Sequence, residues 1–208
     1  MMFVRYESFK EYIRFYPVNT AILTLIVLAH LGFAAISAVL DVPAGALKQA
    51  YGGFVLAPSH GVVPEYWRYV SSVFLHANFG HLLFNAFAVF VFAPPLERAL
   101  GVVRYAALFL FSGIMGNIFT AAFAGGDIFS VGASGAVYGV FGGYLYYMMF
   151  HRRAMDPGSR RTLQTLLIVG FLYSIIVPHV NVYAHLGGLV GGLALTAMYA
   201  KILQGRDR

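Results

Sequence analysis

The sequence contains no cysteine and few charged residues. Without cysteine among its 208 residues, the chain has no disulfide, no thiol nucleophile and no cysteine-ligated metal site. Only 11% of the residues are Asp, Glu, Lys or Arg, whereas soluble domains average about a quarter. The hydrophobic share of 60% and the aromatic share of 16% also exclude a disordered or low-complexity chain. This composition indicates a protein that lies within a lipid bilayer.

Six apolar stretches are long enough, or nearly long enough, to cross a bilayer, which requires about 20 residues of helix. They are residues 18–40, 80–96, 101–124, 134–150, 162–177 and 181–203. The fourth and fifth are short, as expected of helices that begin below the surface in a protein-lined cavity. The sequence therefore predicts an all-α polytopic membrane protein, a six-transmembrane-helix bundle formed by one domain over residues 1–208.

Two connecting segments are expected to lie in the membrane interface. Residues 41–75 form the one long loop, and they are rich in Tyr, Phe and Trp, which favour the interface. Residues 1–17 mix aromatic with charged residues and are interpreted as an amphipathic lead-in to the first span.

Basic residues are distributed unequally between the two sides of such a bundle. With six spans, 12 of the 14 Lys and Arg residues lie on one side, and only Lys48 and Arg68 lie opposite. The positive-inside rule then predicts that both termini are cytoplasmic. The formal net charge of +6 is explained by loops facing anionic lipid, so a nucleic-acid partner is not expected.

Several polar residues fall within or beside the apolar stretches, where each needs a partner or a task. They are His76, His81, Asn85, Ser134, Tyr138 and His185. Helix–helix hydrogen bonds are the simplest interpretation of any one of them. Their common position near the non-cytoplasmic side also favours a functional site.

Ser134 and His185 are the candidate nucleophile and base. Ser134 follows Gly132 at the start of the fourth span, where it is either a helix N-cap or a nucleophile beside free amides. A serine hydroxyl needs a base to become nucleophilic, and histidine is the usual one near neutral pH. No cluster of metal ligands accompanies them, so neither a metal nor another cofactor is expected.

Two stripes of glycine provide a way to bring these residues together. They are Gly135, Gly139 and Gly143 on the fourth span, and Gly188 and Gly192 on the sixth. Small residues four apart let helix backbones approach closely. Packing of one stripe on the other is expected to bring Ser134 and His185 together near the outer surface.

Three further residues have positions suited to the same site. His81 and Asn85 lie four apart on the second span, so both project from one helix face as possible donors to an oxyanion. Tyr138 follows Ser134 by four residues and either stacks beneath the imidazole or fills the core.

Together these motifs resemble the rhomboid family of intramembrane serine proteases. The motifs are Trp67-Arg68, the segment from His76 through His81 to Asn85, Gly132-Ala133-Ser134-Gly135 with Tyr138, and Ala184-His185 with Gly188 and Gly192. The resemblance covers residues 67–192 and is closest to the compact six-span prokaryotic type. The departures are the pair Pro94-Pro95, where the family more often has glycine, and the lack of a large cytoplasmic domain.

The resemblance implies an endopeptidase that cleaves single-pass or polytopic membrane proteins in or near a spanning segment. Ser134 and His185 would form a catalytic dyad that passes through an acyl-enzyme. His81, Asn85 and the Ser134 amide would hold the oxyanion, and Tyr138 would orient His185. The implied location is the prokaryotic inner membrane, with the active site towards the non-cytoplasmic face and His76 tying down the first loop.

Other interpretations stay open at this stage. Asp127, seven residues before Ser134, is the one acid that would complete a triad. An inactive relative that binds transmembrane clients would keep the fold, although such relatives typically lose the serine or the histidine. A small transporter or channel would need polar residues along the whole path, whereas here they gather towards one side.

Overall fold

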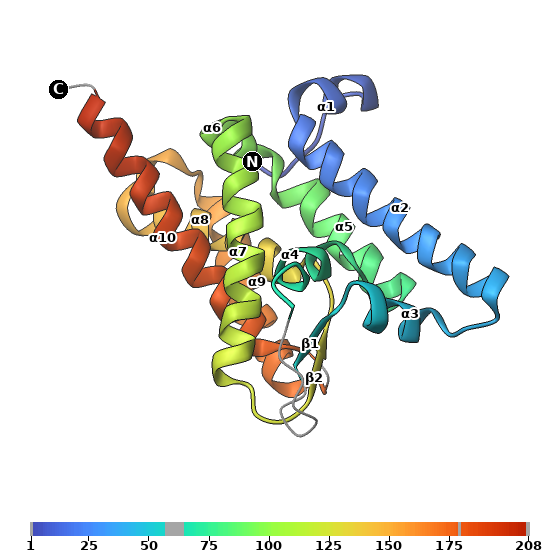
Figure 1. Cartoon of the computed structure of the whole chain (residues 1–208). Helices are drawn as coiled ribbons and strands as arrows, with labels where there is room; N and C mark the ends of the chain where they lie inside the picture. Colours follow the sequence, from blue (N-terminus) through green and yellow to red (C-terminus); the bar gives the residue numbers. More distant parts are fainter. Residues whose placement is uncertain (1, 57–64, 179, 207–208) are drawn as a thin grey trace.

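The computed structural model describes residues 2–56, 65–178 and 180–206, most of which are helical. The helices are α1 (Phe9–Phe15), α2 (Pro17–Leu40), α3 (Ala44–Tyr51), α4 (Arg68–Ser71), α5 (Phe79–Phe92), α6 (Pro94–Leu100), α7 (Val102–Phe123), α8 (Ser134–Phe150), α9 (Pro157–Ile176) and α10 (Val182–Arg206). Two 3₁₀ helices, η2 (Ser72–Phe74) and η3 (Arg152–Ala154), and two strands, β1 (Phe54–Leu56) and β2 (Ile128–Ser130), complete the described part. Helices α1 and α6 and the end of α10 lie at one end of the bundle, and α3 and the strands lie at the other (Figure 1).

The long helices are those of an integral membrane protein. Within the described ranges, α2, α7 and α10 are long and apolar enough to cross a bilayer, and residues 68–74 with α5 form a bent pair that adds a fourth crossing if it counts as one. Helix α8 has 17 residues, and the first turn of α9, PGSRR, contains Ser159, Arg160 and Arg161. The helical membrane fold is confirmed, whereas the predicted number of six crossings is not.

A small β-sheet departs from the predicted all-α fold. β1 pairs with β2 in antiparallel register, with Phe54 opposite Ser130 and Leu56 opposite Ile128. Each strand has three residues, too few to show an alternating pattern of polar and apolar side chains. The sheet joins the first loop to the segment that leads into α8.

The second predicted span, residues 80–96, is interrupted at Pro94-Pro95, the proline pair expected to end it. Helix α5 stops at Phe92, and α6 begins at Pro94 after the single residue Ala93. Because Pro94 and Pro95 have no N–H to donate to the preceding turn, the chain starts a new helix there. The predicted end at residue 96 therefore lies inside α6.

Helices α8 and α10 pack with their backbones in contact. A Cβ atom added to Gly188 would collide with the carbonyl oxygen of Gly135, and one added to Gly192 would collide with that of Gly139. Helix α7 joins the pair in the same way, since a Cβ on Gly116 would lie 2.7 Å from Ala184 O. The expected packing of the two glycine stripes is therefore confirmed.

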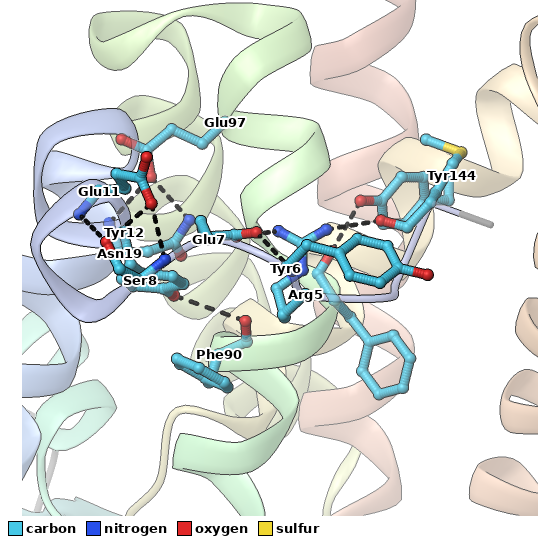
Figure 2. A network of polar contacts seen from close by, with 12 residues as sticks. Arg5, Tyr6, Glu7, Ser8, Glu11, Tyr12, Asn19, Phe90, Glu97 and Tyr144 are labelled. Atoms are coloured by element: carbon cyan, nitrogen blue, oxygen red, sulfur yellow. Dashed lines mark hydrogen bonds and ion pairs between the residues drawn. The ribbon is translucent and has the colours of Figure 1, made fainter.

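The first turn of α2 is held by a carboxylate from α6. Glu97, only 2% exposed, accepts hydrogen bonds from Val18 N at 2.8 Å, Asn19 N at 3.0 Å and Asn19 Nδ2 at 2.6 Å (Figure 2). The Tyr105 hydroxyl on α7 donates to Asn19 Oδ1 at 2.7 Å. These bonds satisfy amides that have no partner within α2 and match a negative charge to the helix N-terminus.

We expect Glu97→Ala to destabilise the protein by about 2–3 kcal/mol, because buried donors lose a charged acceptor. The measurement is the free energy of unfolding in mixed detergent–SDS micelles. Arg98→Ala, at the exposed neighbouring position, is the control and should unfold like the wild type. Equal stability of Glu97→Ala and wild type would contradict a structural role for this carboxylate.

Candidate active site

Ser134 is the first residue of α8 and is partly exposed. The hydrogen bonds of this helix begin with Val137, whose N–H donates to Ala133 O at 2.9 Å. The amides of the first turn, including that of Ser134, therefore have no partner within the helix. Such an N-terminus favours a negative charge placed beside it.

The loop before Ser134 is pressed against His81. Gly132 has φ of +135°, which strongly favours glycine. A Cβ atom on Gly132 would lie 2.6 Å from Cε1 and 2.9 Å from Nε2 of His81. Both this backbone conformation and the neighbouring His81 imidazole therefore require glycine at position 132, two residues before the serine.

His76 connects the first loop to the loop that carries the serine. It is fully buried, and its Nε2 accepts from Ala133 N at 3.4 Å while its carbonyl oxygen accepts from Lys48 Nζ at 2.6 Å. Lys48, on α3, is itself 3% exposed, and burial lowers the pKa of its ammonium group. These contacts fit the expectation that His76 ties down the first loop.

The Trp67-Arg68 pair holds the C-terminal end of α3. Arg68 Nη1 donates to Gln49 O at 2.8 Å and to Gly53 O at 3.0 Å, and Nη2 donates to Ala50 O at 2.8 Å. The guanidinium also lies 4.5 Å above the Trp67 ring. One arginine thus satisfies three carbonyl oxygens at the end of α3, where the helix itself supplies no donors.

His185 is buried on α10 between two other helices. Its ring stacks on that of Tyr138 from α8, with centroids 4.1 Å apart and planes inclined by 11°. Its Nδ1 lies 2.6 Å from Oγ of Ser174 on α9. The predicted stacking of Tyr138 beneath the imidazole is present, and it limits the rotation of His185.

Ser134 lies on α8 and His185 on α10, and these two helices are in contact at the residues next to them. A Cβ on Gly135 would lie 3.3 Å from Ala184 O, so the residues adjoining the pair are in contact. Within the described part of the chain, no hydrogen bond joins Ser134 to His185. In structures without substrate such bonds are often long, and they tighten only in the reacting complex.

His81 and Asn85 lie one turn apart on α5, as predicted. Asn78 Oδ1 caps this helix by accepting from His81 N at 2.9 Å. Asn85 is 5% exposed, and its Nδ2 donates one hydrogen bond to His81 O at 2.9 Å. Because an amide nitrogen has two N–H groups, Asn85 keeps a second donor for another acceptor.

Asp127 was the acid considered as a third member of a triad. It is exposed and directly precedes β2. The nitrogen of His185 that an acid would approach in a triad already contacts Ser174. The residues that the structure describes also contain no group of three or more His, Asp or Glu side chains arranged to hold a metal.

Three residues of the site were not predicted from sequence: Ser174, Lys48 and Asn181. Asn181 Nδ2 donates to Thr120 Oγ1 at 2.9 Å and to Ser130 Oγ at 3.1 Å, and its Oδ1 accepts from Ala184 N at 3.0 Å. Ser174 and Asn181 lie in or beside apolar runs, and that position was the available signal, since a polar group at membrane depth needs a partner. Lys48, which is followed by Gln49 in the first loop, gave no such signal.

These features define a helical integral membrane protein with a polar site enclosed by its helices. A family model, the Rhomboid domain, matches residues 63–202. The chain belongs to the rhomboid family, as its motifs indicated.

Curated relatives agree with this assignment. The chain is 41% identical over 198 residues to the rhomboid protein YdcA of Bacillus subtilis (strain 168), covering 94% of each chain. It is 31% identical over 133 residues to the rhomboid protease GluP of the same organism, which is 64% of this chain and 26% of GluP. RHOMBOID-like protein 6, mitochondrial, of Arabidopsis thaliana is 36% identical over 132 residues, 63% of this chain and 43% of that protein. The chain thus spans less than half of the two longer relatives.

We expect Gly188→Val to inactivate the protein, because its side chain would displace the carbonyl of Gly135, next to Ser134. A shift of about 1 Å can cost a hundredfold in rate. Ala194→Val, at an exposed position of the same helix, is the matched control. The measurements are cleavage of a model transmembrane substrate and the unfolding midpoint of both variants. A folded Gly188→Val protein with full activity would contradict the packing argument.

Proposed function

We propose that this chain is a single-domain intramembrane serine endopeptidase that cleaves membrane proteins in or near a spanning segment. The observation that carries the proposal is the backbone contact between α8 and α10, because Gly135, next to Ser134, lies against Ala184 and Gly188, which adjoin His185 or follow it by one turn. The stacked Tyr138 ring supports it by fixing that imidazole. The protease named among the relatives points to the same reaction class.

In the proposed reaction, Ser134 Oγ attacks the carbonyl carbon of the scissile peptide bond, and its proton passes to His185 Nε2. Collapse of the tetrahedral intermediate breaks the C–N bond, and His185 gives that proton to the departing amine. The products of this half-reaction are an acyl-enzyme on Ser134 and a free amine. Water then attacks the ester with the same help from His185, which restores the serine.

The negative charge that develops on the carbonyl oxygen needs donors placed in advance. The Ser134 amide lies at the positive end of α8, and the His81 ring lies against the loop that precedes it. The second N–H of Asn85 is the third proposed donor. Because these groups come from two helices, α5 and α8, the site depends on how closely the bundle packs.

We expect Ser134→Ala and His185→Ala to abolish cleavage of a transmembrane substrate in liposomes. Their combination should cost no more than either change alone, because the two residues act as one unit. Wild-type protein should react with a fluorophosphonate at Ser134, and EDTA should leave the activity unchanged. Gly125→Ala, where a Cβ meets nothing within 4 Å, is the folding control.

Each rival function predicts a different result. An inactive relative would bind substrate without cleaving it, and its serine would not be labelled. A transporter or channel would move solute across the liposome membrane. In Ser134→Ala that flux would persist although the fluorophosphonate labelling is lost. Substantial cleavage by Ser134→Ala would contradict the proposed nucleophile.

The proposal includes an orientation, with both termini cytoplasmic in a prokaryotic inner membrane and the site towards the opposite face. Helix α1 and the end of α10 lie at the same end of the bundle (Figure 1). We expect reporter fusions after Arg208 and within 152–161 to report the cytoplasm, and a tag at Gly125-Gly126 to report the other side. A reversed reporter at 152–161 would mean that α8 does not cross the membrane.

A further inference from the structure

Ser174 is the hydrogen-bond partner of His185 on the side of the imidazole that faces α9. Its Oγ lies 2.6 Å from His185 Nδ1, and the two residues are 3% and 7% exposed. The surrounding sequence, LLIVGFLYSII, is otherwise apolar apart from Tyr173. Because the Ser174 hydroxyl is buried in an apolar helix, it forms its hydrogen bonds with protein groups and not with water.

The positions of the hydrogen atoms follow from the groups around Ser174. Its Oγ also lies 2.6 Å from the carbonyl oxygen of Gly170, one turn earlier in α9. A carbonyl oxygen only accepts, and a serine hydroxyl has one hydrogen to donate. That hydrogen therefore goes to Gly170 O, and His185 Nδ1 must be the donor in its contact with Ser174.

Tyr138 lies beside the same pair. A Cβ on Gly170 would collide with the Tyr138 hydroxyl, so the phenol borders the turn of α9 that carries Ser174. Ser174 Oγ accepts from Nδ1 and donates to Gly170 O.

We propose that Ser174 is a positioning residue that holds His185 in the tautomer protonated at Nδ1, and this proposal rests on the proposed function. That tautomer leaves the lone pair of Nε2 free to take the proton of Ser134. The other tautomer would present an N–H to Ser134 and could not act as its base. Ser174 thus stands where a carboxylate stands in a catalytic triad.

A neutral acceptor suits this depth in the membrane. A carboxylate next to His185 would have to be buried in a low-dielectric bundle, which is costly. When Nε2 takes the Ser134 proton, the imidazolium keeps its Nδ1–H directed at Ser174. The proton leaves again from Nε2 to the amine, so Ser174 neither gains nor loses a proton in the cycle.

The test uses the full-length protein in liposomes, with Ser174→Ala, Ser174→Thr and the matched control Thr196→Val. Thr196 donates the same type of bond to the carbonyl four residues earlier, Gly192 O at 2.8 Å, and is 1% exposed on α10. We expect Ser174→Ala to lower kcat, and the rate of fluorophosphonate labelling, on the order of 10- to 100-fold, with little change in KM. Ser174→Thr should retain most activity, and Thr196→Val should leave both rates unchanged.

A spectroscopic measurement separates positioning from folding. In protein labelled with ¹⁵N-histidine, the His185 signals are those missing from His185→Gln. At neutral pH they should show a protonated Nδ1 in wild type and gain the Nε2-protonated pattern in Ser174→Ala. An Nε2-protonated wild type overturns the proposal even if Ser174→Ala fails to fold.

Two other results would overturn it. One is labelling of Ser174→Ala at the wild-type rate, and the other is slow labelling with Nδ1 still protonated. Failure of the proposed function has a different signature, which is cleavage that survives Ser134→Ala. The tautomer measurement needs no substrate, so it remains decisive in that case.

Discussion

The backbones of α8 and α10 touch at Gly188 and Gly192, with no side chain between them. In most helix pairs a substitution is partly absorbed by a change of rotamer, whereas backbone atoms have no such freedom. The residue in contact with Gly188 is Gly135, the neighbour of Ser134. The spacing of the two helices therefore determines how far the serine lies from the histidine, and the remaining parts of the site are arranged around that distance.

Polar contacts help to hold the first loop to this pair. The Lys48 ammonium donates to His76 O, and His76 in turn accepts from the amide of Ala133. The β1–β2 ladder and the bond from Gly132 N to Ser72 O, 2.9 Å, add two backbone connections. Hydrogen bonds in such surroundings are strong because the local dielectric is low, so the loop and the serine segment form one connected structure.

Helical periodicity predicted the site because its main residues repeat along single helices. Ser134 and Tyr138 are one turn apart on α8, and the predicted fourth span has the same bounds as that helix, 134–150. The glycine stripes predicted which helices meet, and the structure agrees. Ser174 could not be predicted in this way, because its role depends on where α9 lies relative to His185.

Other elements escaped prediction for related reasons. The strands are short, and each gains its pairing from a partner more than 70 residues away, which no local pattern records. Hydropathy located the apolar segment around residues 80–96, whereas the proline pair and not hydropathy marked its break, since proline interrupts a helix without making it less apolar. The number of membrane crossings has the same limit, because segment length alone does not show whether a 17-residue helix such as α8 crosses the bilayer or is buried within the bundle.

The carboxylate that caps α2 has a consequence for the order of assembly. Val18 and Glu97 are separated by 79 positions, so α2 is synthesised well before the acceptor for its first amides exists. At typical translation rates that interval is roughly 4 to 16 s. During this time the amides at the start of α2 can be satisfied by interfacial water but not by protein. Helix α2 therefore gains this cap only after α5 and α6 have been made, at a stage when α7 to α10 are still to be synthesised.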